Sequence, residues 1–305
     1  MKSLPNFLRQ RGVTMVEMIA VIVITGIIGG AVAVFIRLPV QSYTDSVARA
    51  AMTDVADITL RRIARDLRLA LPNSVRVTGG AGGAVYLEFL QTTAGLRYLA
   101  EDDVAGTAGP GNYLNWNNPL AKTFEVVGGV PSGRHAPVVG NFVVVYNLGE
   151  DQEPGNAYNC GAVVCNRARI DGINTTSSAT TPPITTTTIT MDTNPFAAQG
   201  AAGTPLTSPS KRFYVVTSAV TYRCDRATGK LTRFWNYTIT PGQPMTFSDG
   251  SSALLAENVK ACDFKYANLA HVRSGMVGLS LELGIPGQSQ ASLKLEHQVH
   301  VDNTP

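Results

Sequence analysis

One long apolar run near the N-terminus constrains this chain more than any other feature. Residues 18–36 (MIAVIVITGIIGGAVAVFI) contain no charged side chain. As a helix that rises about 1.5 Å per residue, this run would extend roughly 28 Å, close to the thickness of a hydrocarbon core of about 30 Å. The sequence therefore predicts one helix that spans a membrane.

The residues before the run set its orientation and its processing. Three cations precede it: Lys2, Arg9 and Arg11. By the positive-inside rule they hold the N-terminus in the cytoplasm, so most of the chain is exported. A secretory signal peptide is cut after its apolar core. Here the small residue Gly12 lies before the core, and cleavage between Gly12 and Val13 would leave the helix on the mature protein.

A basic leader, Gly12, an acid at Glu17 and an uninterrupted apolar run together resemble the class III signal peptide of type IV prepilins and type II secretion pseudopilins. In that family a prepilin peptidase cuts after the glycine and methylates the new N-terminal amine, which here belongs to Val13. Most members have Phe at that position, so Val13 is a mild departure. The resemblance implies a leader over residues 1–12 and a membrane-spanning and assembly helix over residues 13–38.

Glu17 is costly at this place. A charge at the bilayer centre costs roughly 2.5–3.5 kcal/mol on insertion scales, and such groups usually have a partner. No side chain in residues 18–36 can pair with it. The resemblance implies that Glu17 pairs with the Val13 amine of a neighbouring subunit and so sets the stagger between parallel helices. The alternative is a solvated carboxylate in the headgroup region.

An amphipathic helix is predicted over residues 39–72. Apolar residues recur three to five positions apart from Val47 to Leu71, and Pro39 is expected to kink the chain. The run RRIARDLR is interrupted by an acid, as on a solvated helix face. Net charge is +3, which the three leader cations account for. A neutral mature chain offers no case for nucleic-acid binding.

The remaining residues, 73–305, predict a β-rich exported head. Strand patterns occur at residues 75–77, 85–90, 97–100, 142–146, 213–223, 230–239, 262–266, 276–285 and 292–301. Residues 254–259 are expected to form a helical or irregular turn. The fold class is therefore α+β, with a long N-terminal helix packed on an antiparallel sheet.

Residues 171–211 form a tract rich in Thr and Ser, including TTSSATTPPITTTTIT. Such a composition buries little apolar area, so the tract is expected to be a surface excursion. Residues 185–191 in its middle are expected to pair as an edge strand.

Four cysteines lie in the exported part, where oxidation is expected: Cys160, Cys165, Cys224 and Cys262. Three pairings are open. The favoured one joins Cys160 to Cys165 across a short polar loop and Cys224 to Cys262 between strands. A zinc site is the alternative, although these spacings fit no standard set of ligands.

No motif for catalysis or for a cofactor is present, so no enzyme activity, cofactor or metal is expected. His297 and His300 resemble an HxxH metal pair. On a strand, however, residues three apart point to opposite faces, so both are expected to be structural. His135 and His271 have no acid or nucleophile near them in sequence.

Four later segments narrow the resemblance to the biogenesis protein O family of the mannose-sensitive haemagglutinin (MSHA) pilus: residues 50–77, 220–237, 254–266 and 297–305. Those proteins are minor pilins, similar in plan to J-type pseudopilins and W-type minor pilins. The resemblance implies an inner-membrane protein with a periplasmic head that later primes assembly at the pilus tip. The implied partners are major and other minor pilins, the prepilin peptidase and the inner-membrane assembly platform.

Three other functions stay open from the sequence. The first is a J-type minor pseudopilin of type II secretion, and the second is a tip adhesin that binds a surface glycan. The third is a periplasmic enzyme anchored in the membrane. At 305 residues the chain is about twice the length that the resemblance implies for a major pilin, which favours a rare subunit over a repeating one.

Overall fold

The structure is a computed structural model that describes residues 12–79, 83–104, 112–160, 164–179, 185–203, 205–267, 274–286 and 288–305. The leader predicted over residues 1–12 therefore lies outside the described residues except for Gly12, and so does His271. The chain divides into two compact units, Met1–Ala51 and Met52–Pro305.

One long helix, α1, runs from Met15 to Leu67 (Met15–Leu67). Its residues up to Ala51 belong to the first unit, and its residues from Met52 onward belong to the second. Pro39, where a kink was expected, lies inside α1, and the helix continues through that position without a break. The helix ends five residues earlier than predicted because the next backbone groups pair with a strand. The amide of Leu71 donates to the carbonyl of Leu90 at 2.7 Å, so residues after Leu67 leave the helical hydrogen-bond pattern.

The head contains two antiparallel sheets. The larger has nine strands: β1 (Arg76–Thr78), β2 (Val85–Tyr98), β3 (Thr123–Val127), β4 (Phe142–Val144), β5 (Arg167–Ser177), β6 (Thr185–Met191), β7 (Arg212–Asp225), β8 (Lys230–Tyr237) and β9 (Ser251–Ala256). The smaller is the meander of β10 (Val259–Ala267), β11 (Ser274–Ile285) and β12 (Gln288–Asp302). Short helices are α2 (Glu101–Val104), η1 (Gly133–His135) and α3 (Phe196–Ala201). The α+β prediction is confirmed.

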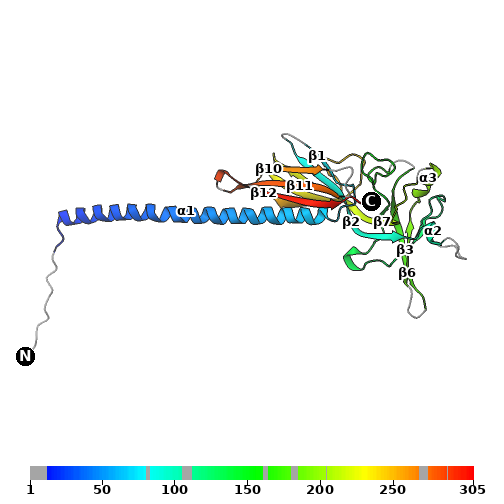
Figure 1. Cartoon of the computed structure of the whole chain (residues 1–305). Helices are drawn as coiled ribbons and strands as arrows, with labels where there is room; N and C mark the ends of the chain where they lie inside the picture. The colour runs from blue at the N-terminus through cyan, green and yellow to red at the C-terminus, as the bar shows by residue number, and fades with distance from the viewer. Residues whose placement is uncertain are drawn as a thin grey trace, which may run out of the picture. The chain divides into compact units, whose positions relative to one another are not determined.

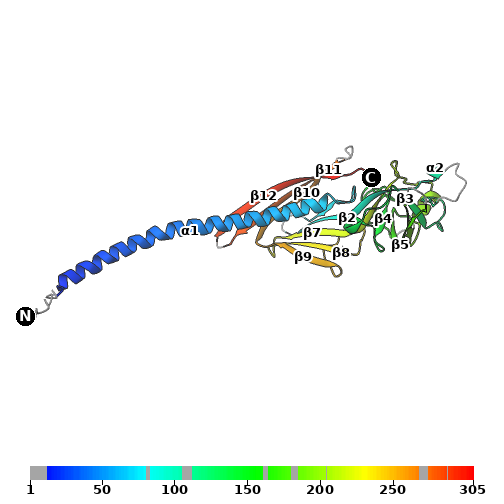
Figure 2. The same ribbon diagram turned by 90° about the horizontal axis from the view of Figure 1, so that it is seen from below.

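The C-terminal part of α1 forms one core with both sheets. Its buried side chains recur three or four positions apart, the spacing of a single helix face: Ala56, Leu60, Ile63, Ala64 and Leu67. They share a cluster with Leu87 of β2, Tyr222 of β7 and Leu281 of β11. In Figure 2 this part of the helix lies between β10–β12 and β7–β9. The helix layer is the name used below for this part of α1 together with β10–β12 and the strands of the larger sheet that share its core, namely β1, β8, β9 and the adjoining parts of β2 and β7.

A second lobe is built onto the far ends of β2 and β7. These two strands pair along most of their length, and residues 99–211 connect their ends. The successive pairings β2–β7, β7–β4, β4–β5, β5–β6, β6–β3 and β3–β2 form a ring that closes on itself. A separate core fills the lobe, with Phe124, Ile189 and Phe213 all fully buried. In Figure 1 this lobe is the region that contains β3, β6, α2 and α3. We call it the ring lobe.

Three predictions for the head need correction. The strand predicted at an edge, residues 185–191, is β6, which pairs with β3 on one side and β5 on the other. The tract over residues 171–211 is therefore no mere surface excursion, because Ile189, Met191 and Phe196 of this tract lie in the core of the ring lobe. Of the turn expected at residues 254–259, the first three residues belong to β9, which pairs with β8; Glu257 and Asn258 form a bend, and Val259 begins β10.

The last strand follows its predicted alternation. Val299 and Val301 are buried, while Lys294, Glu296, Gln298 and His300 on the other face are exposed. The predicted hairpin is also present, since β7 and β8 pair from Asp225 and Lys230 outward. Alternation with period two identified these strands because one face of each meets a core.

Candidate assembly and anchoring site

The predicted processing point lies in an exposed segment just before α1. Gly12, Val13 and Thr14 have no regular secondary structure, and the helix begins at Met15. Val13 is 65% exposed, and a Cβ placed on Gly12 would meet no atom within 4 Å. Exposed, irregular segments with small residues are the preferred substrates of peptidases. The Gly12–Val13 bond is accordingly accessible.

Glu17 lies in the first turn of α1 and contacts its own chain. The carboxylate accepts a long hydrogen bond from the backbone amide of Thr14 at 3.5 Å, while the hydroxyl of Thr14 accepts one from the amide of Glu17 at 3.3 Å. This reciprocal pair is a capping box. Sequence reasoning found no partner for Glu17 within its own chain, yet the T-x-x-E pattern of residues 14–17 is a signal for one.

The apolar run predicted to span a membrane is exposed along α1. Its larger side chains are more than half exposed at Ile22, Ile27 and Phe35, among others. Within the described residues, α1 is the one helix long and apolar enough to cross a membrane. The hydroxyl of Thr25 donates to the carbonyls of Val21 and Ile22, so this polar group is satisfied inside the helix. The exposed apolar surface is available for lipid and for other helices.

An ionic clamp fastens the other end of α1 into the head. The carboxylate of Asp66 accepts from Nε of Arg233 at 2.9 Å and from the hydroxyl of Tyr222 at 2.7 Å. Asp66 and Arg233 are only 6% and 7% exposed. Burial and the neighbouring carboxylate raise the pKa of Tyr222 above its ordinary value. Because β7 and β8 supply these partners, the clamp fixes the helix against the centre of the larger sheet.

A second buried ion pair joins β1 to β2. Nε of Arg76 donates to the carboxylate of Glu88 at 2.6 Å, and the hydroxyl of Tyr237 donates to the same carboxylate at 2.7 Å. The guanidinium of Arg76 also lies 3.7 Å from the ring centre of Tyr158. Burial and the Glu88 charge raise the pKa of both Tyr158 and Tyr237 above the ordinary tyrosine value. A third carboxylate, Glu150, contacts Arg76 at 3.1 Å from a half-exposed position, so the cation joins β1 and β2 to a nearby loop.

The four cysteines form two disulfides in the structure, Cys160–Cys165 and Cys224–Cys262, and their Cα atoms are 5.1 and 6.5 Å apart. This is the pairing that the spacing favoured. The longer bridge joins β7 to β10 and therefore ties the two sheets of the helix layer together.

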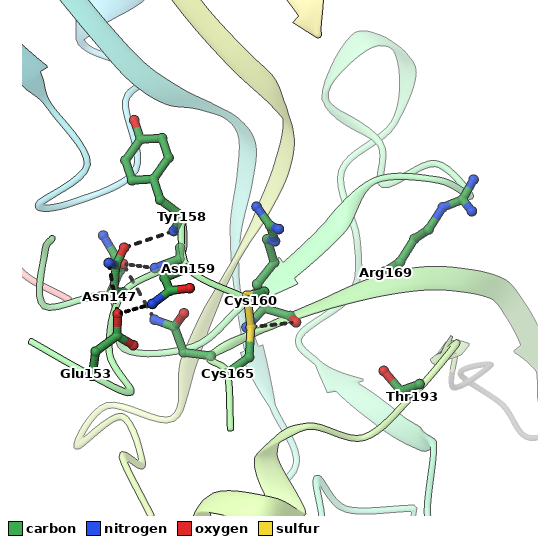
Figure 3. The surroundings of a disulfide bond; sticks show 12 residues. Asn147, Glu153, Tyr158, Asn159, Cys160, Cys165, Arg169 and Thr193 are labelled. Atoms are coloured by element: carbon green, nitrogen blue, oxygen red, sulfur yellow. Dashed lines mark hydrogen bonds between the residues drawn. A yellow bond between two sulfur atoms is a disulfide. The ribbon is translucent and has the colours of Figure 1, made fainter. Parts of the chain in front are cut away.

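The shorter bridge closes a loop beside a group of polar side chains. Figure 3 shows Asn147, Glu153 and Asn159 gathered on one side of it, while Arg169 points away. The amide of Asn159 donates to Glu153 at 2.8 Å, and the amide of Asn147 donates to the carbonyl of Pro72 at 2.7 Å. The hydrogen bond of Asn147 joins the segment before the bridge to the segment that follows α1.

The described residues contain no group of three or more His, Cys, Asp or Glu side chains that could hold a metal ion. His297 and His300 lie on opposite faces of β12, as predicted, and His135 contacts the carbonyl of Thr93 at 3.3 Å through Nδ1.

Comparison with known proteins adds one finding. A family model for the prokaryotic N-terminal methylation motif matches residues 8–33, which include Gly12, Val13 and Glu17. No curated protein and no solved structure gives a significant match to the chain. The motif indicates a protein of the type IV pilin and pseudopilin class. Members of that class are structural proteins that interact with other pilins, the prepilin peptidase and membrane assembly machinery.

Proposed function

We propose that this protein is a minor pilin of an MSHA-type type IV pilus, and that it primes assembly at the fibre tip. The observation that carries the proposal is the combination of an exposed pilin-type helix with a head enlarged by the ring lobe. The exposed N-terminal part of α1 would insert into the membrane and pack against the helices of other subunits. The ring lobe, residues 99–211 with the ends of β2 and β7, has its own core and its own closed strand pairing.

The size of the head favours the tip over the shaft. A helical filament repeats one contact between identical subunits, so each head must fit beside its neighbours at every repeat. An ordered second lobe adds volume to each repeat, whereas a subunit at the end has neighbours on one side alone. Three residues of the Thr-rich tract, Ile189, Met191 and Phe196, contribute to the core of this lobe.

The MSHA assignment is supported by the four segments that resemble that family. In the structure they correspond to the end of α1, the β7–β8 hairpin, the β9–β10 region and the end of β12. All four belong to the helix layer, and none belongs to the ring lobe. The resemblance leaves out the Thr-rich tract over residues 171–211, which lies in the ring lobe.

We further propose cleavage between Gly12 and Val13, methylation of the Val13 amine, and pairing of that amine with Glu17 of an adjacent subunit. Before assembly the capping box with Thr14 would hold the carboxylate of Glu17 at the helix start. Mass spectrometry of the mature protein should find N-methylated Val13 at the N-terminus. An N-terminus beyond residue 36 would exclude the pilin class.

The proposed location is the inner membrane, with the N-terminus cytoplasmic and the head periplasmic, and afterwards the pilus tip. The proposed partners are major and minor pilins and the assembly platform. Deletion of the gene should sharply reduce the number of pili while the major pilin remains in the membrane. Immunogold labelling should mark fibre ends alone, and continuous labelling along the shaft would reject the tip role.

The methylation motif is shared by pilins and pseudopilins, so the deletion strain must also be tested for secretion. If the protein is a minor pilin, the deletion strain should export folded periplasmic enzymes normally and carry few pili. Failed secretion with normal pili would instead identify a pseudopilin of the type II system.

A further inference from the structure

The outer side of the ring lobe carries a cleft of about 630 Å³ where β2 and β7 approach the end of β3. Two arginines, Arg97 and Arg212, line it together with Tyr214 and the pair Gly128–Gly129. The proposed role in pilus assembly uses none of these residues.

The two arginines face each other directly. Arg97 of β2 pairs in register with Arg212 of β7, which places like charges on adjacent positions of one sheet face. Such pairs destabilise a sheet unless another group compensates them. Asp103 compensates Arg97, with contacts of 2.9 and 3.1 Å to Nη2. Arg212 is exposed, and no carboxylate among the described residues forms an ion pair with it. The side chain of Arg212 instead hydrogen-bonds to Tyr214, so its positive charge stays at the cleft beside the aromatic ring.

An aromatic ring borders these charges. Tyr214 lies opposite Gly95 in the β2–β7 register, and a Cβ on Gly95 would come within 3.2 Å of the tyrosine ring. Glycine at this position therefore lets the ring lie against the strand. The hydroxyl of Tyr214 donates to the carbonyl of Thr304 at 3.2 Å, which fixes the ring in place. A held aromatic ring offers an apolar face with little loss of entropy on binding.

A glycine turn borders the cleft beside Tyr214. Gly128 and Gly129 have φ angles of 89° and 83°, in the left-handed region that favours glycine. A Cβ on either residue would meet no atom within 4 Å, so this turn is open to an approaching ligand.

We propose that this cleft binds an anionic saccharide, with its acidic group on Arg212 and its sugar ring on Tyr214. A nucleic acid is disfavoured because polyanion binding uses several cations along a track. From Arg97 to Arg212 the chain has nine acidic and seven basic residues, so the surrounding lobe is net acidic. A single localised acid group suits this cleft, and it is either the carboxylate of a uronic acid or the phosphate of a sugar phosphate.

The test uses the full-length protein in phosphatidylcholine nanodiscs and measures binding by isothermal titration calorimetry. The probes are galacturonic acid, glucose 6-phosphate, a neutral dextran oligomer, inorganic phosphate and a short DNA duplex. One or both acidic saccharides should bind, and the better of the two identifies the acid group. The dextran should not bind. Failure of both acidic saccharides, or tighter binding of DNA, would overturn the proposal.

Three variants locate the site. Arg212→Gln should weaken saccharide binding about tenfold or more, since a hydrogen bond to a charged group contributes about 1.5–3 kcal/mol. Arg169→Gln, which removes an equally exposed charge from β5, should leave affinity unchanged. Tyr214→Leu should weaken the saccharide and leave inorganic phosphate unaffected. Equal losses in the two arginine variants, or no loss in Tyr214→Leu, would contradict the assigned geometry. None of these outcomes depends on where in the fibre the protein lies.

Discussion

Replacing Asp66 by alanine should destabilise the head strongly, because it removes the one carboxylate of the clamp at the end of α1. Asp66 is 6% exposed and accepts hydrogen bonds from Arg233 at 2.9 Å and Tyr222 at 2.7 Å. In the variant the guanidinium of Arg233, only 7% exposed, would stay buried without its counter-charge. Its remaining contacts are to Gln91 at 3.3 Å and to the ring of Trp235.

The expected magnitude follows from this burial. Breaking a buried ion pair by removing one partner typically costs about 3–5 kcal/mol, since the remaining charge is uncompensated. For a unit of this size, each kcal/mol lowers the melting temperature by roughly 2–4 °C. The variant should therefore melt roughly 6–20 °C below the parent protein.

The matched control lies on the same helix. Asp57 pairs with Arg61 at 2.8 Å, but the two side chains are 46% and 74% exposed. An exposed pair four residues apart contributes about 0.3–0.5 kcal/mol, so Asp57→Ala should be nearly silent. The comparison isolates burial, because the residue type, the helix and the substitution are the same.

Unfolding by urea in detergent micelles, followed by tryptophan fluorescence, measures the difference. Both tryptophans lie in the head, and Trp235 reports directly on Arg233 at 4.7 Å. The double variant Asp66→Ala/Arg233→Met should recover much of the loss, because it leaves no buried charge unpaired. If Asp66→Ala came within 1 kcal/mol of Asp57→Ala, or the double variant were no more stable than the single one, the clamp would not act as described.

Three further predictions concern assembly, crosslinking and pH. Glu17→Ala should permit export and membrane insertion but block incorporation into fibres, as judged from sheared pili; normal incorporation would refute the intersubunit pair. Replacing Cys224 and Cys262 by serine should cost about 4 kcal/mol by chain entropy, against about 2 kcal/mol for the shorter bridge, as measured by urea unfolding; equal costs would count against that model. The raised pKa values of Tyr222 and Tyr237 mean that the folded state holds these protons more tightly than the unfolded chain. The contribution of these two tyrosines to the free energy of unfolding is therefore fully present below about pH 10 and decreases as the pH rises further. Both phenols should ionise only when the protein unfolds. Gradual ionisation, followed by absorbance at 295 nm, before unfolding would contradict their burial.

The sequence alone was sufficient for the features that depend on local pattern. The apolar run, Gly12 and Glu17 lie within a short stretch, so composition and spacing located the anchoring helix and the candidate processing point. Alternation with period two located most strands of the helix layer, because each of these strands buries one face. The T-x-x-E pattern that begins at Thr14 also predicts a helix cap from sequence. It was missed because a partner for Glu17 was sought only in residues 18–36 and in a neighbouring subunit.

Tertiary structure decided what local pattern cannot encode. Threonine-rich β6 lies inside a sheet because β3 and β5 supply partners on both sides, and those partners come from distant parts of the chain. Its burial depends on alternate positions such as Ile189 meeting the core of the ring lobe, which average composition conceals. The same holds for Asp66, which is one acid among several on an amphipathic helix until Arg233 and Tyr222, more than 150 residues away, surround it. The arginine pair at the cleft likewise arises from the register of β2 on β7, a long-range pairing that the energetics of the whole sheet select.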